Sequence, residues 1–305
     1  MNKVVIIGAS LAGHTVATAL RDGNKDCPIT LITEEAFTFY DRRMSFDYLE
    51  GKIKEKEILL SNPDFYQTKN INFLKERKAV SVNTAKRLVF LKNGEKRESI
   101  EYDFLVVCSG RKTFLPEIDG INKEGVFTFD SLKELKDAKN HLLGECVCVI
   151  GSNWLTVEFA KTVAARQKEL KIITDKNIDM TLLPGNAEII NTQVVEIIGE
   201  SGVQAVKFKE GKIIGASIVF VMGKSVPNVD FLKDTPVQMS EEAVLVDENM
   251  RSNISNIFSC GSVCCVKGGD FKLKSWDQTL AESRVLAENL IKTIGGGDVG
   301  CKRAC

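Results

Sequence analysis

The sequence predicts an α/β protein with two units of parallel sheet, the second inserted in the first. Strand-like apolar runs recur between amphipathic helical patterns, which is typical of parallel sheets rather than of all-β or all-α proteins. One segment is also repeated: Cys146–Gly151 is similar to Lys3–Gly8, and each copy is followed by a helical pattern and another strand. The equal spacing within the two copies predicts two Rossmann-type units.

Length and composition narrow the class of protein. A chain of 305 residues is long for one hydrophobic core and predicts two domains. The 44% hydrophobic and 27% charged residues are ordinary globular values. Lysine plus arginine equals aspartate plus glutamate at 41 each, which argues against a nucleic-acid partner. No apolar run is long enough for a bilayer and residues 1–8 are too short for a signal peptide, so we expect a cytoplasmic protein without a membrane partner.

The first unit begins with an apolar strand that runs directly into the turn Gly8-x-Ser10-x-x-Gly13. A tight turn at Gly8 directs the start of the next helix, with Ser10 and Ala12, toward a pyrophosphate, which the free N–H groups and the helix dipole attract. Gly13 allows the strand and the helix to pack closely. Because Ser10 replaces the middle glycine of the usual motif, the motif needs support from its context.

That context is a second strand with an acidic residue after it. We expect a helix over Thr15–Arg21 and a strand over Ile29–Ile32. Glu34 follows the strand, at the position where an acidic side chain holds a ribose hydroxyl. The first turn is therefore predicted to bind a dinucleotide.

The remaining elements follow in order. Residues 71–105 alternate as strands with a hairpin turn at Asn93-Gly94, and an apolar strand covers Tyr102–Ser109. Apolar residues at helical spacing predict a last helix over Gln278–Ile294. The predicted domain limits are 1–115 and 236–294 for the first domain and 116–235 for a shortened second domain. Residues 295–305 form a glycine-rich tail that we expect to be flexible.

Five motifs resemble those of the pyridine nucleotide-disulfide oxidoreductase superfamily, and together they extend over most of the chain. They are Val4–Gly13 with Glu34, Leu105–Arg111, Val147–Glu158, Met222–Asn228 and Asn256–Ser262. Within the superfamily, the segment Glu34–Arg43 is similar to the rubredoxin reductase, ferredoxin reductase and nitrite reductase-like branch. The chain ends soon after the last expected helix, so we expect the C-terminal dimerisation domain of larger relatives to be missing.

The resemblance implies non-covalently bound FAD in the first domain. It places Ser109, Gly110, Gly261 and Ser262 beside this cofactor, in addition to the residues of the first turn. Arg42 is expected either to contact the FAD pyrophosphate, which suits a bidentate guanidinium, or to be a solvated surface charge. Hydride transfer from nicotinamide to flavin is chemistry of the cofactors, and the protein positions them.

The second motif resembles a nicotinamide dinucleotide site but departs from its pattern. Only Gly151 of the three glycine positions is kept, since Asn153 and Thr156 occupy the others, so NAD(P)H binding is left open. Glu158 matches a family glutamate that orients the nicotinamide carboxamide, although the helix dipole also favours a glutamate in the first turn. Asp175 follows the next strand and favours NADH over NADPH if either binds.

Two further departures concern the crossover and the flavin side. Between the strand Leu170–Thr174 and the next strand near Ala187 there are only about a dozen residues, close to the minimum for a parallel crossover with its helix. We therefore expect part of the second unit to be missing. Ser262 stands where the family carries an aspartate against the flavin ribityl chain, and its hydroxyl still donates and accepts hydrogen bonds.

Nine scattered cysteines do not form a secreted disulfide framework. The first part of the chain has no C-x4-C pair and the second domain no C-x-x-C pair, so a thiol–disulfide reaction at the flavin is disfavoured. The tail residues Cys301 and Cys305 lie beside basic neighbours, which favour the thiolate. They are either a redox or metal-binding pair or an inconsequential tail, and no metal site is predicted elsewhere.

The leading hypothesis from the sequence is an FAD-dependent NAD(P)H oxidoreductase that passes electrons to a small redox protein, such as a rubredoxin or ferredoxin, or within a larger complex. The alternative is a flavin-binding electron relay or partner subunit that no longer binds NAD(P)H. The alternative is supported by Asn153, Trp154, Thr156 and the short second crossover. The first turn and its acidic residue, with Gly8, Gly13 and Glu34, do not distinguish the two.

Overall fold

The computed structural model describes residues 2–142, 146–164, 169–269 and 273–296. The chain divides into two compact units. The first consists of Met1–Asp41, Leu59–Arg111 and Pro227–Cys305, and the second of Arg42–Ile58 and Lys112–Val226. The second unit is thus inserted in the first, as predicted. The unit limits differ from the predicted domain ranges chiefly in two segments: 42–58 groups with the second unit, and 227–235 groups with the first.

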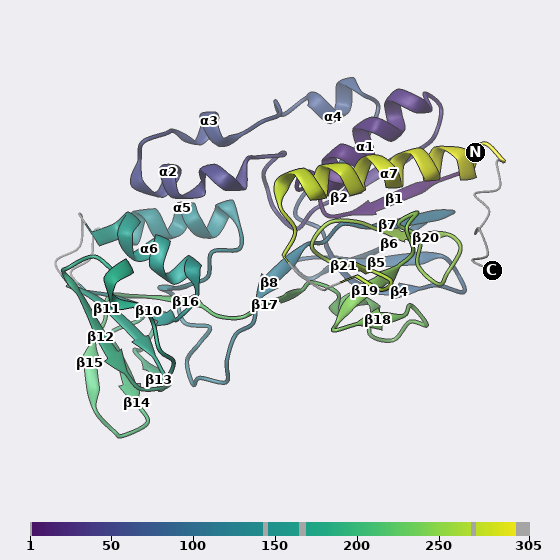
Figure 1. Ribbon diagram of the computed structural model, residues 1–305. Helices are drawn as coiled ribbons and strands as arrows, with labels where there is room; N and C mark the ends of the chain where they lie inside the picture. Colours follow the sequence, from purple (N-terminus) through teal and green to yellow (C-terminus); the bar gives the residue numbers. More distant parts are fainter. Residues whose placement is uncertain (1, 143–145, 165–168, 270–272, 297–305) are drawn as a thin grey trace. The chain divides into compact units, whose positions relative to one another are not determined.

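The first unit is built on a five-stranded parallel sheet in the order β20-β7-β1-β2-β3 (Figure 1). Its central strand is entirely apolar and buried because it has neighbours on both sides and elements over both faces. The strands are β1 (Val4–Ile7), β2 (Ile29–Ile32), β3 (Asn72–Leu74), β7 (Phe104–Val107) and β20 (Ile257–Ser259). The predicted strand Ile29–Ile32 is confirmed.

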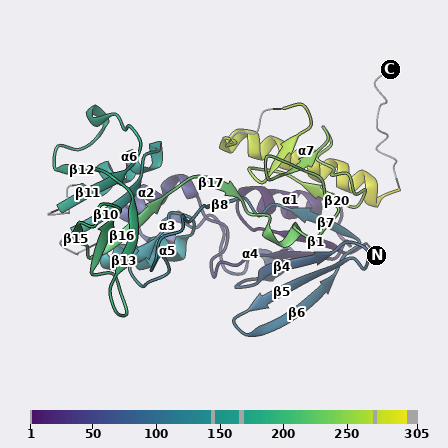
Figure 2. The same ribbon diagram turned by 90° about the horizontal axis from the view of Figure 1, so that it is seen from below.

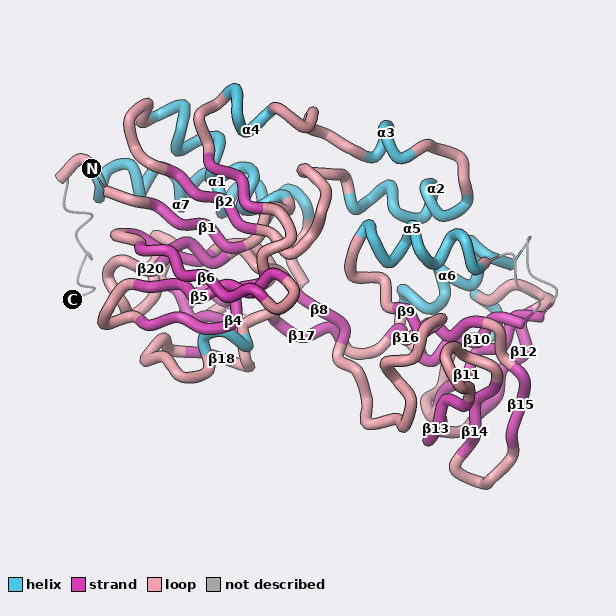
Figure 3. Tube along the Cα trace, turned by 180° about the vertical axis from the view of Figure 1, so that it is seen from behind, coloured by secondary structure: helices cyan, strands magenta, loops and turns pink. Residues whose placement is uncertain are grey.

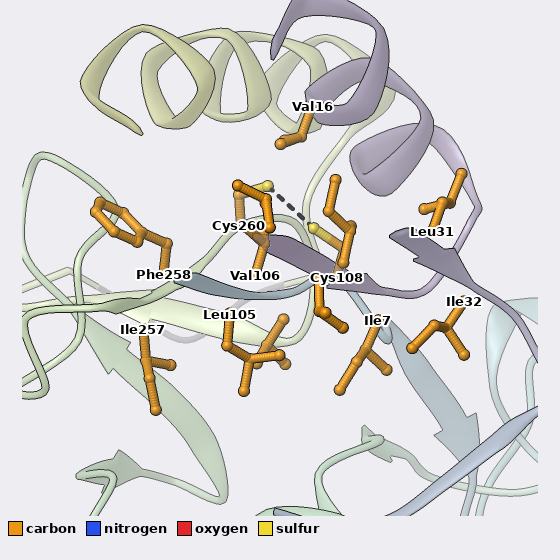
Figure 4. Packing of buried hydrophobic residues seen from close by; sticks show 14 of the residues in the cluster. Ile7, Val16, Leu31, Ile32, Leu105, Val106, Cys108, Ile257, Phe258 and Cys260 are labelled. Carbon is orange, nitrogen blue, oxygen red and sulfur yellow. Dashed lines mark hydrogen bonds between the residues drawn. The ribbon is translucent and has the colours of Figure 1, made fainter. Parts of the chain in front are cut away.

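Two helices pack beside each other on one face of this sheet, α1 (Leu11–Gly23) and α7 (Trp276–Ile294) (Figure 1). Figure 4 shows Val16 of α1 pointing toward the sheet residues Val106 and Cys108. Both helices begin earlier than predicted. The start of α7 is fixed by a capping box, in which the Ser275 hydroxyl accepts from the Gln278 N–H and the Gln278 side chain accepts from the Ser275 N–H.

Two smaller three-stranded sheets complete the first unit. Strands β4 (Lys78–Asn83), β5 (Leu88–Asn93) and β6 (Lys96–Glu101) form a three-stranded sheet, visible side by side in Figure 2. The hairpin between β5 and β6 is confirmed, but its two-residue turn is Gly94-Glu95, one position after the predicted Asn93-Gly94, because Asn93 pairs with Lys96. A second small sheet is formed by β18 (Met239–Ser240), β19 (Ala243–Val246) and β21 (Cys264–Val266).

The second unit repeats the plan of the first. Its parallel sheet has the order β12-β11-β10-β16-β9, so that β10 takes the place of β1, β11 that of β2 and β16 that of β7. The duplication predicted from the sequence is therefore confirmed. The strands are β9 (Val126–Phe127), β10 (Cys146–Gly151), β11 (Glu169–Thr174), β12 (Ala187–Asn191) and β16 (Ile218–Met222).

The second sheet is covered differently on its two faces. Helices α5 (Leu132–His141) and α6 (Trp154–Ala164) lie on one face together with α2 (Ser45–Glu50), as Figure 3 shows. Leu49 of α2 is buried in this core, which explains why the segment 42–58 belongs to this unit. The other face packs against the antiparallel strands β13 (Val194–Ile198), β14 (Ala205–Phe208) and β15 (Ile213–Gly215).

The crossover from β11 to β12 is short, as the sequence predicts. Only the 3-10 turn η2 (Met180–Leu182) lies between the two strands, yet they pair in parallel. Strands β8 (Arg111–Thr113) and β17 (Ser225–Pro227) pair where the chain passes between the units. The other short elements are α3 (Glu55–Ile58), α4 (Phe65–Thr68), η1 (Arg42–Met44) and η3 (Asp230–Leu232). Among the helices in the described ranges, none is both long and apolar enough to cross a membrane.

A partly buried histidine in the first unit, His14, predicts a pH dependence of stability. The ring of His14 is stacked on Phe39 at 4.2 Å, and its Nδ1 lies 2.9 Å from the Tyr66 hydroxyl oxygen. Burial, with a smaller contribution from the Lys69 charge, lowers the pKa of His14 to about 4. The unfolded chain therefore binds a proton that the folded chain does not, and stability falls as the pH drops from about 6.5 toward 4.

We expect His14→Gln to remove part of this pH dependence. The difference in unfolding free energy between pH 7 and pH 4 should shrink by as much as about 3 kcal/mol, measured by urea unfolding at each pH. His141→Gln, which changes an exposed ring, is the control. An identical pH dependence in wild type and His14→Gln would contradict the prediction.

Candidate functional site

The turn between β1 and α1 depends on two glycines that leave no room for a side chain. Gly8 has φ +104°, and a Cβ on it would lie 2.2 Å from the Cys108 carbonyl oxygen. A Cβ on Gly13 would lie 1.8 Å from the Gly8 carbonyl oxygen. The start of α1 therefore packs directly against the end of β1, as expected from the sequence.

The first turn of α1 has no side-chain cap. Ser10 is the residue before the helix, and its hydroxyl makes no capping hydrogen bond. The first backbone N–H bonded within the helix is that of His14, which donates to the Ser10 carbonyl. The N–H groups of Leu11, Ala12 and Gly13 thus have no intrahelical partner, an arrangement that attracts anions. These residues fit the phosphates of a dinucleotide.

Two more predicted flavin-side segments lie at the ends of neighbouring strands. The Ser109 hydroxyl donates to the Asn228 carbonyl at 2.6 Å, and the Asn228 N–H donates to the Gly110 carbonyl at 3.0 Å. Gly110 has φ +67°, a conformation that favours glycine. Gly261 lies against the first turn of α1, since a Cβ on it would be 3.2 Å from the Ala12 Cβ. The first turn, Ser109–Gly110 and Gly261 all come from the first unit.

A partly buried ion pair that was not predicted from the sequence adjoins Gly261. The Gly261 N–H donates to Oε2 of Glu282 at 3.0 Å, and Lys274 Nζ donates to the same oxygen at 2.7 Å. Burial alone would lower the pKa of Lys274, but Cys264 and Glu282 together raise it above its usual value. In the sequence, the capping box of Ser275 and Gln278 marks the start of α7 and so places Lys274 just before this helix. It gives no sign that Lys274 pairs with Glu282. Ser262 accepts from the Lys274 N–H at 3.4 Å.

The acidic residue expected at the ribose is exposed after β2. Glu34 pairs loosely with Lys78, with 3.7 Å between Oε2 and Nζ. The neighbouring Glu35 instead accepts from the Tyr40 hydroxyl at 3.1 Å. Glu34 is therefore the more accessible carboxylate of the two. Arg42 lies in η1 of the second unit and is exposed, so its contact with a pyrophosphate stays a prediction.

In the second turn, between β10 and α6, a glycine again packs too closely against a strand end for a side chain. Unlike the turn between β1 and α1, this turn also has a side-chain cap on its helix. A Cβ on Gly151 would lie 2.6 Å from the Met222 carbonyl oxygen. Asn153 accepts from the Thr156 N–H at 3.0 Å, and its amide donates to the carbonyls of Met222 and Gly223. The side chain of Asn153 thus occupies part of the helix start that a pyrophosphate would use. The second turn fits a dinucleotide less fully than the first.

The other predicted residues of the second unit have partners of their own. Glu158 is one turn into α6 and accepts from Lys161 at 2.9 Å. Asp175 follows β11 directly, and the hydrogen bond from Gln193 at 2.8 Å holds the pKa of its carboxyl below the usual value. Trp154 begins α6 and is 62% exposed. Whether Glu158 and Asp175 contact a nicotinamide dinucleotide stays a prediction.

The cysteines in the described part of the chain are free thiols. Cys108 and Cys260 lie 3.5 Å apart, sulfur to sulfur, in the buried core shown in Figure 4. Cys146 is partly exposed, and a hydrogen bond from Cys148 holds the pKa of its thiol below the usual value. The tail pair Cys301 and Cys305 lies outside the described residues.

Comparison with known proteins identifies the family. The model of the pyridine nucleotide-disulphide oxidoreductase family matches residues 2–283, so this chain belongs to that family. The chain is 27% identical to an NADH oxidase of Methanocaldococcus jannaschii over 88% of this chain and 64% of the relative. It is 28% identical to an NADH-rubredoxin oxidoreductase of Clostridium acetobutylicum over 86% of this chain and 68% of the relative.

The fold is shared with solved structures. The putidaredoxin reductase chain in its covalent complex with putidaredoxin superposes with a TM-score of 0.82 at 21% identity, over 95% of this chain and 75% of that chain. The matched region of this chain covers about two thirds of the length of the NADH oxidase and of the NADH-rubredoxin oxidoreductase. It covers 37% of the length of a nitrite reductase of Bacillus subtilis. These relatives agree with the branch that the motifs indicate.

The crowding at Gly13 makes a specific prediction. Gly13→Ala should lower the affinity for FAD by at least about tenfold, although alanine favours a helix by about 1 kcal/mol over glycine. FAD content after reconstitution, read from the flavin absorbance, measures the effect, and circular dichroism checks the fold. Gly185→Ala is the matched control, since nothing lies within 4 Å of its Cβ position. Undiminished FAD content in Gly13→Ala would refute the assignment of the first turn.

Proposed function

We propose that this chain is an FAD-dependent NAD(P)H oxidoreductase that passes electrons to a small redox protein. The observation that carries the proposal is the start of α1, which has no side-chain cap and packs closely on β1 at Gly8 and Gly13. The second unit has the same order of strands around its own turn. Membership of the pyridine nucleotide-disulphide oxidoreductase family supports the reaction type. The names of the relatives, NADH oxidase and NADH-rubredoxin oxidoreductase, support the donor and the kind of acceptor.

Each group in the first unit has a distinct part in holding FAD. The N–H groups of the first turn of α1 bind its phosphates, and Glu34 accepts from the adenosine ribose hydroxyls. Ser109 and Gly110 are fixed by Asn228 at the neighbouring strand end, and Ser262 supplies a hydroxyl. When bound, FAD supplies the group that accepts a hydride and releases electrons to the acceptor.

The second unit is assigned to the nicotinamide dinucleotide. The N–H groups of Trp154 and Leu155 stay available at the start of α6 after Asn153 has taken that of Thr156. Asp175 lies at the carboxyl end of β11, where its carboxylate accepts from a ribose hydroxyl and disfavours the extra phosphate of NADPH. Glu158 orients the carboxamide, for which it must leave Lys161.

The reaction is tested by anaerobic reduction. The purified chain is loaded with FAD, and NADH or NADPH is added without oxygen while the flavin absorbance is followed. We expect NADH to bleach the flavin faster than NADPH, and an oxidised rubredoxin or ferredoxin to restore the colour. A chain that binds FAD but ignores both donors would contradict the NAD(P)H assignment, and a chain that cannot be loaded with FAD would contradict the flavin assignment as well.

The alternative, a flavin-binding relay that no longer takes NAD(P)H, is favoured by one observation, the cap made by Asn153. The alternative predicts that the second turn is closed to a pyrophosphate. The first proposal predicts that the cap only weakens binding, because two N–H groups of the helix start are still available.

Saturable binding of NADH by the wild type separates the two proposals, and Asn153→Gly tests whether the cap limits that binding. We expect the Kd for NADH to fall several-fold, since glycine frees the Thr156 N–H and allows close backbone approach, while the loss of the cap costs only a few tenths of a kcal/mol. Asn153→Ala is the matched control, because it removes the cap but keeps a Cβ and should improve binding less. A weaker affinity of Asn153→Gly than of wild type would contradict this account.

A further inference from the structure

The ion pair Lys274–Glu282 is nearly buried and lies next to the proposed phosphate site. The two side chains are 14% and 18% exposed. Oε2 of Glu282 accepts from the Gly261 N–H, and Gly261 in turn packs against Ala12 in the first turn of α1. A carboxylate is therefore placed beside the helix start that binds an anion, in a position that no motif assigns.

A carboxylate at this place opposes the function of the helix start. Neighbouring like charges in partly buried surroundings are screened less than in water and repel each other, and the FAD phosphates carry negative charge. The carboxylate also accepts the Gly261 N–H, which is then not available to a ligand. An uncompensated Glu282 would therefore weaken the binding of any anionic dinucleotide.

Lys274 compensates this charge. Its ammonium is 2.7 Å from Oε2 of Glu282 and 3.4 Å from the sulfur of Cys264. Burial raises the pKa of the Cys264 thiol to about 12, so that neighbour is neutral at pH 7. The positive charge of Lys274 is thus directed to Glu282, and the pair as a whole is neutral.

We propose that Lys274 is a positioning residue for the anionic cofactor: by neutralising Glu282, it keeps the phosphate site beside Gly261 and Ala12 from being negatively charged. This inference rests on the proposed binding of FAD in the first unit. The pair sets the affinity for the cofactor through charge, in addition to any contribution to the stability of the fold.

The test compares three variants by titrating the apoprotein with FAD at pH 7 and low salt and following the flavin fluorescence. Lys274→Met should raise the Kd on the order of tenfold, because it leaves the carboxylate uncompensated. Glu282→Gln should lower the Kd, because it leaves the positive charge while its amide oxygen still accepts from Gly261. The double variant should return close to wild type.

Two further readouts separate charge from structure. The effect of Lys274→Met on FAD should shrink at high salt, and the Kd for riboflavin, which has no phosphate, should change little. Lys3→Met removes a cation from an exposed pair with Glu101 and is the control that should bind as wild type. Thermal unfolding of each apoprotein reports the structural contribution independently.

The proposal is overturned if Lys274→Met and Glu282→Gln both weaken FAD binding, in parallel with their loss of stability, because the pair then acts only on the fold. It is also overturned if Lys274→Met binds FAD as wild type does. If wild type itself does not bind FAD, the proposed function fails, and that outcome is distinct from either result.

Discussion

The close approach of the helix start to the strand end is the constraint on which the rest of the first unit depends. Gly13 packs where any side chain would meet the Gly8 carbonyl oxygen at 1.8 Å, and Gly8 packs against the Cys108 carbonyl. This contact fixes α1 over the sheet and directs its free N–H groups to the carboxyl ends of the strands. Ser109, Gly110 and Gly261 follow strands of the same sheet and belong to the same part of the unit.

The second unit shows how the same plan changes when the glycines are replaced. Gly151 keeps the tight contact with the strand end, but Asn153 uses its side chain to cap α6 and to bind two carbonyls. One backbone donor of this helix start, the Thr156 N–H, is thereby bonded within the protein, whereas the start of α1 has no side-chain cap. The two turns share a topology and differ in how many backbone donors they leave free.

Much of this arrangement could be predicted from the sequence, because it depends on local patterns. The similarity of Cys146–Gly151 to Lys3–Gly8 predicted the two parallel sheets of similar topology. The small number of residues between Thr174 and Ala187 predicted the short crossover. The place of residues 42–58 could not be predicted, since it depends on where Leu49 finds a hydrophobic core. The Lys274–Glu282 pair also escaped prediction, because its significance comes from Gly261, which is adjacent only in the fold.

We infer that the turn between β1 and α1 holds a flavin dinucleotide and that the turn between β10 and α6 still accepts a nicotinamide dinucleotide. Calorimetric titration of the FAD-loaded chain with NAD+, with the flavin absorbance recorded after dialysis, tests both at once. We expect one NAD+ to bind per chain, with the FAD retained. Displacement of FAD by NAD+, or no binding of NAD+ to the FAD-loaded chain, would contradict it.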